Sequence, residues 1–154
     1  MTEPEYLAWT ERTVPAYAAD KVASGQLAQA DALDLARKEY RELLPDGLAT
    51  TDNHLLSILD VESRPVGMLW FAVKTKFATQ VAYLFDINVW PDRQREGHAS
   101  RAFAALEVEV RRLGLSGIAL HVFGHNTGAQ ALYAGLGFRP TNISLYKPVG
   151  AASD

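Results

Sequence analysis

Cysteine is missing from this 154-residue chain. Its absence excludes disulfide bonds, zinc–thiolate sites, iron–sulfur clusters and thiol nucleophiles. A basic excess is missing too: 15 Lys and Arg stand against 18 Asp and Glu, which gives a formal charge of −3. This balance argues against a nucleic-acid-binding protein, because such proteins usually carry clustered positive charge. The four histidines have no acidic partners at ligand spacing, so no metal site is expected.

Long apolar runs are also missing. No stretch of about 18 consecutive apolar residues occurs, so no membrane span and no membrane partner are predicted. Residues 1–17 carry acidic side chains where a secretory signal needs a basic segment followed by an apolar one. The composition, 48% hydrophobic and 21% charged, is typical of globular proteins. We therefore expect a cytoplasmic protein whose residues 1–154 form a single domain.

The hydrophobic pattern divides the chain into a helical first third and a mixed remainder. Thr2 and Glu5 have capping-box spacing at the start of a first helix, which Pro15 is expected to bend or divide. Apolar residues at steps of three and four predict a second helix over 27–43. Beyond it, the pattern predicts strands over 55–61, 66–73, 80–89, 117–123 and 143–147, and helices over 103–113 and 127–136.

This order of elements predicts an α+β fold, with helices flanking a mixed, mostly antiparallel central sheet. The strands at 80–89 and 117–123 would form its parallel pair, because a helix lies between them and such crossovers are right-handed.

Residues 91–100 leave a predicted strand, pass through a basic loop and enter a helix. Such a turn directs free backbone N–H groups and the positive end of a helix at one point, which favours an anion. Gly97 and Ala99 are small enough to let a phosphate approach the backbone. The alternative is an ordinary strand–helix turn with arginines on the surface.

A second segment, 126–138, predicts a capped helix. Asn126 stands at the N-cap position, Gly137 closes the helix and Phe138 returns to the core. Structure alone would explain this segment.

Taken together, Gln-x-x-Gly-x-Ala at 94–99 and Asn-x-x-Ala-x-x-Leu-Tyr-x-x-x-Gly-Phe at 126–138 resemble the GNAT superfamily of N-acetyltransferases. The resemblance covers about residues 54–148, which it implies are the sheet and acetyl-CoA-binding core, with 1–50 as a helical acceptor-side segment. It implies that the parallel strands splay apart around the pantetheine arm. It also implies a set of cofactor-binding residues: Ile87, Asn88 and Val89 beside the arm, Gln94, Arg95, Glu96, Gly97, His98, Ala99 and Ser100 around the pyrophosphate, and Asn126 and Tyr133.

The resemblance further implies that Tyr133 is the general acid. Asp86 is our candidate for the amine side, because it is the only carboxylate along 83–89 and burial would raise its pKa. It would act as base or as ammonium anchor; the alternative is a carboxylate satisfied by backbone amides. Trp70 is a further candidate on the acceptor side, with an ordinary core residue as the alternative.

We therefore expect an enzyme that transfers the acetyl group of acetyl-CoA, as co-substrate, to a primary amine of a small molecule by direct attack in a ternary complex. An aminoglycoside antibiotic such as kasugamycin is the suggested acceptor, which would make the activity one of resistance. The alternatives are a protein lysine or N-terminal acetyltransferase and a non-catalytic acyl-CoA-binding module. After Phe138 only one short strand fits, where many GNAT proteins have a long hairpin, and a homodimer stays open.

Overall fold

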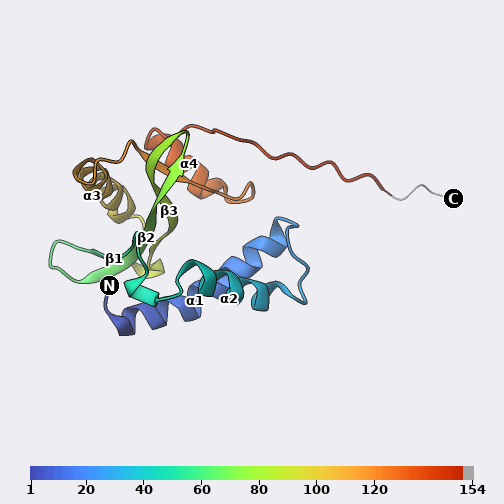
Figure 1. The fold of residues 1–154 in the computed structure, drawn as a ribbon, viewed down its shortest axis with the longest axis horizontal. Coiled ribbons are helices and arrows are strands. Elements are labelled where there is room, and N and C mark those ends of the chain that lie inside the picture. The colour runs from blue at the N-terminus through green and yellow to red at the C-terminus, as the bar shows by residue number, and fades with distance from the viewer. Residues whose placement is uncertain (151–154) are drawn as a thin grey trace.

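The computed structural model describes residues 1–150, so residues 151–154 of the expected domain lie outside it. Short 3₁₀ turns cover Gly47–Ala49 and Pro91–Arg93. The elements are the helices α1 (Glu3–Ala23), α2 (Ala32–Leu43), α3 (His98–Arg112) and α4 (Thr127–Gly135), and the strands β1 (Asn53–Leu59), β2 (Pro65–Lys76), β3 (Thr79–Val89) and β4 (Ile118–Leu120) (Figure 1).

The four strands form one sheet in the order β1-β2-β3-β4. The first three are antiparallel, and β4 runs parallel to β3. The predicted α+β fold with a mixed, mostly antiparallel sheet is thereby confirmed. The parallel pairing extends only from Ala82 to Leu84 on β3, so the following part of β3 has no strand beside it on that edge. This is the predicted splay.

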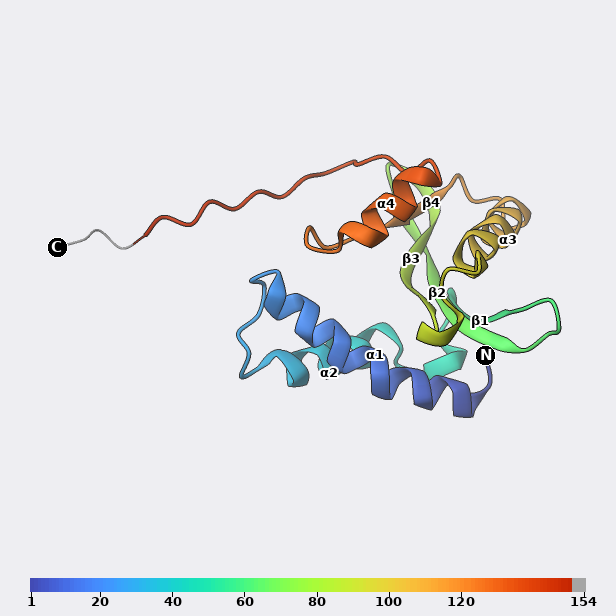
Figure 2. The ribbon, with the colours of Figure 1, turned by 180° about the vertical axis from the view of Figure 1, so that it is seen from behind.

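Helices cover both faces of the sheet (Figures 1 and 2). On the face of α1 and α2, Trp9 packs with Met68 and Trp70 of β2. On the other face, Phe103 and Leu106 of α3 pack with residues of β2 and β3, and α4 lies against the same cluster. In α3, the apolar stripe of Phe103, Leu106 and Val110 is the side that the helix buries.

Two predictions about the helices were partly wrong. The first helix runs as one element through Pro15, with no division. The proline removes one backbone hydrogen bond, but Val14 and Ala18 on either side are buried against α2, and this packing keeps the helix continuous. The second helix begins at Ala32, several residues later than its pattern suggested.

The predicted strand at 143–147 is also wrong within the single chain. After Phe138, the chain leaves the body as an extended segment (Figures 1 and 2). We call residues 139–150 the C-terminal tail. Its Ile143 and Leu145 are 75% and 91% exposed. A strand needs a neighbour to pair with, and no strand of the described residues lies beside this tail.

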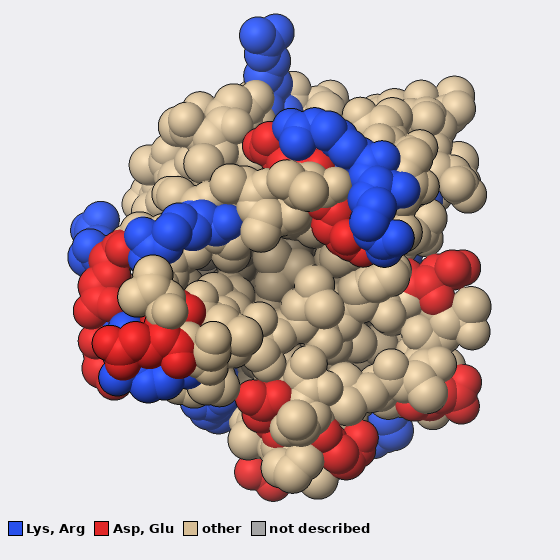
Figure 3. Space-filling view, turned by 90° about the vertical axis from the view of Figure 1, so that its left-hand side faces the viewer, with Lys and Arg blue, Asp and Glu red and all other residues tan. Residues whose placement is uncertain are grey.

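Among residues 1–150, no helix is both long enough and apolar enough to span a membrane. Figure 3 shows one face, hollowed at its centre, on which Lys and Arg are interspersed with Asp and Glu. No continuous basic surface lies on this face.

Candidate active site

A bulge in β3 shapes the centre of the site. Trp70 pairs with Asp86 and Phe71 pairs with Leu84, so Phe85 has no residue opposite it. A bulge of this kind redirects side chains. Phe85 stacks on Trp70 with ring centroids 4.3 Å apart, and the next residue, Asp86, accepts a 2.9 Å hydrogen bond from Trp9 Nε1. Two successive side chains therefore face the α1 side of the sheet.

Both side chains border a large open cleft with a volume of about 1580 Å³. Among the candidate catalytic, cofactor-binding and substrate residues named from the sequence, Glu96 alone does not line it. The others that the cleft brings together are Trp70, Asp86, Ile87, Asn88, Val89, Gln94, Arg95, Gly97, His98, Ala99, Ser100, Asn126 and Tyr133. Segments far apart in the chain thus meet around one space.

The loop before α3 offers a row of free amides. Within residues 1–150, no backbone N–H from Gln94 to Ser100 donates a hydrogen bond to the protein. Arg101 is the first to do so, bonding to the Gly97 carbonyl at 3.1 Å. Gly97 has φ +78°, a conformation that glycine adopts without strain. Consecutive free amides at a helix N-terminus form a concave anion site that suits a pyrophosphate.

Glu96 braces this loop. Its Oε2 lies 2.8 Å from His98 Nε2 and accepts hydrogen bonds of 3.3 Å from Arg93. The bond to His98, followed by that to Arg93, holds the pKa of Glu96 below its usual value. Arg93 also reaches Asp60 in the β1–β2 turn at 3.2 Å. The charge of Glu96 is thus balanced by Arg93, and Arg93 also links the amide loop to the distant β1–β2 hairpin.

Sequence reasoning placed Arg93 in the basic loop but missed Asp60, because no local signal indicates a contact across 33 positions. The Asp60 carboxylate is 3% exposed and also accepts hydrogen bonds from the backbone N–H groups of Arg64 and Glu62. These bonds, with those from Arg64 and Arg93 side chains, lower the pKa of Asp60 strongly, so it is ionised at neutral pH.

The free edge of β3, residues 87–89, runs toward the amide loop. Gln94 Nε2 donates to the Val89 carbonyl at 3.0 Å, which fixes the loop to the end of the strand. Gly67 lies opposite Val89, and a Cβ on Gly67 would come within 2.2 Å of the Asn88 carbonyl oxygen. Only glycine allows β2 to approach this closely. Sequence reasoning missed Gly67, although a glycine inside an apolar strand is a signal of close backbone approach.

Opposing influences act on the pKa of Asp86. Burial raises its pKa, while the hydrogen bonds from Trp9 and from the Ile87 backbone lower it. Its negative charge also reaches Tyr133, whose pKa is raised first by burial and then by Asp86. A phenol with a raised pKa keeps its proton at neutral pH. The cleft therefore holds a carboxylate able to take a proton and a phenol able to give one.

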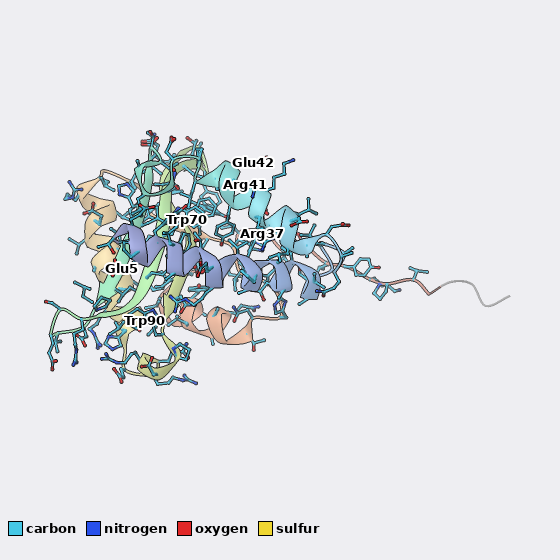
Figure 4. The ribbon with its side chains drawn as sticks, turned by 90° about the horizontal axis from the view of Figure 1, so that it is seen from below. Glu5, Arg37, Arg41, Glu42, Trp70 and Trp90 are labelled. Atoms are coloured by element: carbon cyan, nitrogen blue, oxygen red, sulfur yellow. The ribbon has the colours of Figure 1, made fainter. Side chains whose placement is uncertain are left out.

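Asn126 and Trp70, two further candidate site residues, also stabilise the fold. Asn126 caps α4, accepting a 3.2 Å hydrogen bond from the Ala129 N–H through Oδ1. Trp70 is 1% exposed and donates from Nε1 to Asn53 Oδ1 at 2.8 Å. Figure 4, which labels Trp70, shows α1 running across this face of the sheet. Trp70 thus supports Phe85 from beneath the cleft, and direct contact with an acceptor stays a prediction.

No group of three potential metal-ligating side chains occurs in the described part of the chain. The arrangement instead combines an amide-lined anion loop, an open strand edge leading from it, and a proton acceptor and donor beyond that edge. This arrangement suits a phosphorylated ligand at the amide loop, with a proton acceptor and a proton donor nearby.

Comparison with known proteins shows the family to which the chain belongs. Residues 24–138 match the Acetyltransferase (GNAT) family, and the chain belongs to this family. Membership makes the protein an N-acetyltransferase with acetyl-CoA as the implied co-substrate.

The relatives agree over nearly the whole chain. It is 33% identical over 147 residues to the uncharacterized N-acetyltransferase YycN of Bacillus subtilis (strain 168), covering 96% of this chain and 94% of that protein. The crystal structure of YycN superposes with a TM-score of 0.91 at 32% identity, covering 98% of this chain and 96% of that one.

A more distant likeness concerns the fold alone. The structure of an aminoglycoside antibiotic 6'-N-acetyltransferase from Acinetobacter haemolyticus superposes with a TM-score of 0.58 at 20% identity, covering 88% of this chain and 94% of that one.

Proposed function

We propose that the protein transfers the acetyl group of acetyl-CoA directly to a primary amine of a small molecule, and that Asp86 receives this amine. The observation that carries the proposal is the position of Asp86, which borders the same cleft as the free β3 edge and Tyr133. Substrate and co-substrate would meet between these groups in a ternary complex.

The chemistry assigns a task to each residue. An alkylammonium group, with a pKa near 10, must lose a proton before it attacks. Asp86 orients the ammonium and takes this proton. The nitrogen then forms a bond to the thioester carbon while a backbone N–H near Val89 stabilises the developing oxyanion. As the carbon–sulfur bond breaks, Tyr133 protonates the departing thiolate, and the nitrogen gives its second proton to the resulting phenolate, leaving an amide, CoA and a reprotonated Tyr133.

The cofactor would follow the row of free amides and the strand edge. The pyrophosphate would take the N–H groups of the Gln94–Ser100 loop, and the pantetheine arm would run along residues 87–89 like an added strand. Asn126, whose Oδ1 is engaged as a cap, keeps its amide nitrogen for a contact with this arm.

The walls of the cleft favour a small acceptor. Trp9, Tyr17 and Tyr40 of the first two helices line it, which limits access for a folded protein. The acidic Asp20 and Glu39 share these walls with Asp86, and they suit a cation. Aminoglycosides such as kasugamycin are therefore the first acceptors to test.

Basic residues on the same walls limit how many charges the acceptor carries. Lys74 lies over the Phe85 ring at 4.8 Å, and Lys76 lies over the Tyr83 ring at 5.2 Å. Both would repel a highly charged polycation, so we expect an acceptor with few amines.

The test is thiol release from acetyl-CoA across a panel of aminoglycosides, polyamines, amino acids and a lysine peptide. Activity should be confined to small amines. Tyr133→Phe should lower kcat by about 10²–10⁴-fold, the usual contribution of a positioned acid. Asp86→Asn should lower kcat/KM sharply while calorimetry shows acetyl-CoA binding little changed.

The alternatives predict other outcomes. Labelled protein bands after incubating a lysate with labelled acetyl-CoA would contradict a small-molecule acceptor and favour protein acetylation. Tight acetyl-CoA binding without turnover on any amine would favour a binding module. Wild-type kcat in Tyr133→Phe would show that the phenol is not the acid.

A further inference from the structure

Three cations on the acceptor side of the cleft have no acidic partner. Arg12, Lys74 and Lys76 all line the cleft. Within residues 1–150, none of the three forms an ion pair. The chain carries more acidic than basic side chains, 18 against 15, so possible partners are not scarce. Unpaired cations that share one cleft raise the local concentration of an anion there.

The acidic residues of the same walls, in contrast, each have a neighbour. Asp20 Oδ1 lies 3.1 Å from His125 Nε2. Glu39 Oε2 lies 3.7 Å from Lys21 Nζ. The third acid, Asp86, is the one that our proposal assigns to the reacting amine. The acceptor therefore meets one carboxylate meant for its amine and several cations that no acid balances.

Lys74 is the best placed of these cations. Its Nζ lies 4.8 Å from the centroid of the Phe85 ring and 5.7 Å from that of Tyr83. Lys74 is partly buried, whereas Lys76 and Arg12 are exposed. The ring faces hold the ammonium in place electrostatically, and its N–H donors remain available for an oxygen ligand.

The position of Lys74 excludes the cofactor phosphates as its partner. Lys74 pairs with Val81 near the start of β3, whereas the amide loop follows Val89 at the other end of this strand. At about 3.3 Å per residue, the two positions are about 25 Å apart. An anion held by Lys74 therefore belongs to the acceptor.

The spacing between Lys74 and Asp86 suits an acceptor that carries both charges. Trp70 pairs with Asp86, and Lys74 follows four residues later on the same face of β2. The two backbone positions are therefore about 13 Å apart. The Lys74 side chain turns back over Phe85, the residue next to Asp86. An amine at Asp86 and an acid at Lys74 would be joined by a spacer of several atoms that lies over the Phe85 ring.

We propose that the acceptor is a primary amine that also carries a carboxylate, and that Lys74 binds this carboxylate. The inference rests on the proposed function, because it takes Asp86 to receive the amine. A lysine ammonium is a compact point charge, which a single carboxylate balances. Lys74 fixes the far end of the acceptor and determines specificity, because the second ammonium of a diamine meets repulsion there.

Three acceptors of one length test the inference in the thiol-release assay with acetyl-CoA: 6-aminohexanoate, 6-aminohexanol and 1,6-diaminohexane. We expect kcat/KM to be at least about tenfold higher for the acid than for the alcohol or the diamine, which is the size of a charge-assisted contact. Shorter and longer amino acids of the same series, 4-aminobutyrate and 8-aminooctanoate, then bracket the length of the spacer.

Lys74→Glu should reverse the order, because the new carboxylate repels the acid and attracts the second ammonium of the diamine. Damage to the fold would lower all three activities and could not reverse their order. Lys74→Gln removes the charge alone and should abolish the preference for the acid. Lys38→Glu is the matched control, because it makes the same change of charge on α2 outside the cleft, where the Lys38 side chain is 67% exposed.

Each outcome bears on the inference. Equal kcat/KM for the acid and the alcohol, an acid preference that survives both variants of Lys74, or an equal shift in Lys38→Glu would overturn it and leave acetyl transfer to small amines in place. A higher kcat/KM for an aminoglycoside than for every amino acid of the series would do the same. Silence with every amine would contradict the proposed function itself, and this inference with it.

Discussion

Trp9→Phe tests whether Asp86 works in its ionised form. The substitution keeps an aromatic ring but removes the 2.9 Å hydrogen bond from the indole N–H to the carboxylate. That bond favours ionisation, against burial, which opposes it. Removing it should therefore raise the pKa of Asp86 further. The acid limb of kcat/KM should then move to higher pH.

The size of the effect follows from the single bond lost. A hydrogen bond to a charged group contributes about 1.5–3 kcal/mol. At about 1.4 kcal/mol per factor of ten, the ionised fraction on the acid limb should fall between roughly tenfold and a hundredfold. Trp9 is 2% exposed, so the smaller ring should also lower the free energy of unfolding by about 1–2 kcal/mol.

Trp70→Phe provides the matched control. Trp70 lies in the same cluster, with its ring centroid 5.5 Å from that of Trp9, and its indole N–H bonds to Asn53 instead of Asp86. Both variants lose the same volume and one indole hydrogen bond. The assay is the pH dependence of thiol release with an accepted amine, together with carbon NMR of the Asp86 carboxyl. An acid limb unmoved by Trp9→Phe, or moved equally by Trp70→Phe, would refute the reasoning.

Three further predictions concern residues around the cleft. Gly67→Ala should lower the free energy of unfolding by about 1–3 kcal/mol, because the new Cβ meets the Asn88 carbonyl; urea unfolding checks this, and an unchanged midpoint would contradict the close approach. Asp60→Asn should raise the Kd for acetyl-CoA several-fold in calorimetry, because Arg93 loses a charged anchor of the amide loop, and equal affinity would mean that the loop holds itself. Asp86→Asn should unfold at a higher temperature than wild type at pH 7: burial raises the pKa of Asp86 above its usual 3.8, so its ionised form destabilises the fold above that pH, and the advantage of the variant should vanish as the pH falls toward 3.8.

The sequence was enough to predict those parts of the candidate site that lie within a single stretch of the chain. The amide loop at 94–100 follows from a strand, small residues and a helix start in succession, and the structure shows its N–H groups unpaired within residues 1–150. Asp86 was singled out as a carboxylate in an apolar strand, and burial does raise its pKa. The mixed sheet likewise followed from the order of elements.

The parts that depend on distant contacts could not be predicted. The bond between Trp9 and Asp86 joins residues 77 positions apart. The bulge at Phe85 changes which face of the sheet the following side chains point to, and the alternation of apolar and polar residues in the sequence does not reveal this change. The C-terminal tail shows most clearly what a sequence pattern cannot predict. Its residues have the pattern of a strand, but a strand forms only where the edge of another strand is present to pair with it.

If Asp86 is the proton acceptor, as proposed, the hydrogen bond from Trp9 places one control of the reaction outside residues 24–138, which match the family. The family match begins at residue 24, beyond the end of α1, yet α1 supplies the indole whose hydrogen bond lowers the pKa of Asp86 against the effect of burial. Under the proposed mechanism, the helix that lines the acceptor side of the cleft is also the helix that tunes the proton acceptor. Exchange of this helix between relatives, by recombination or by design, would alter the choice of amine and the pH optimum in a single step.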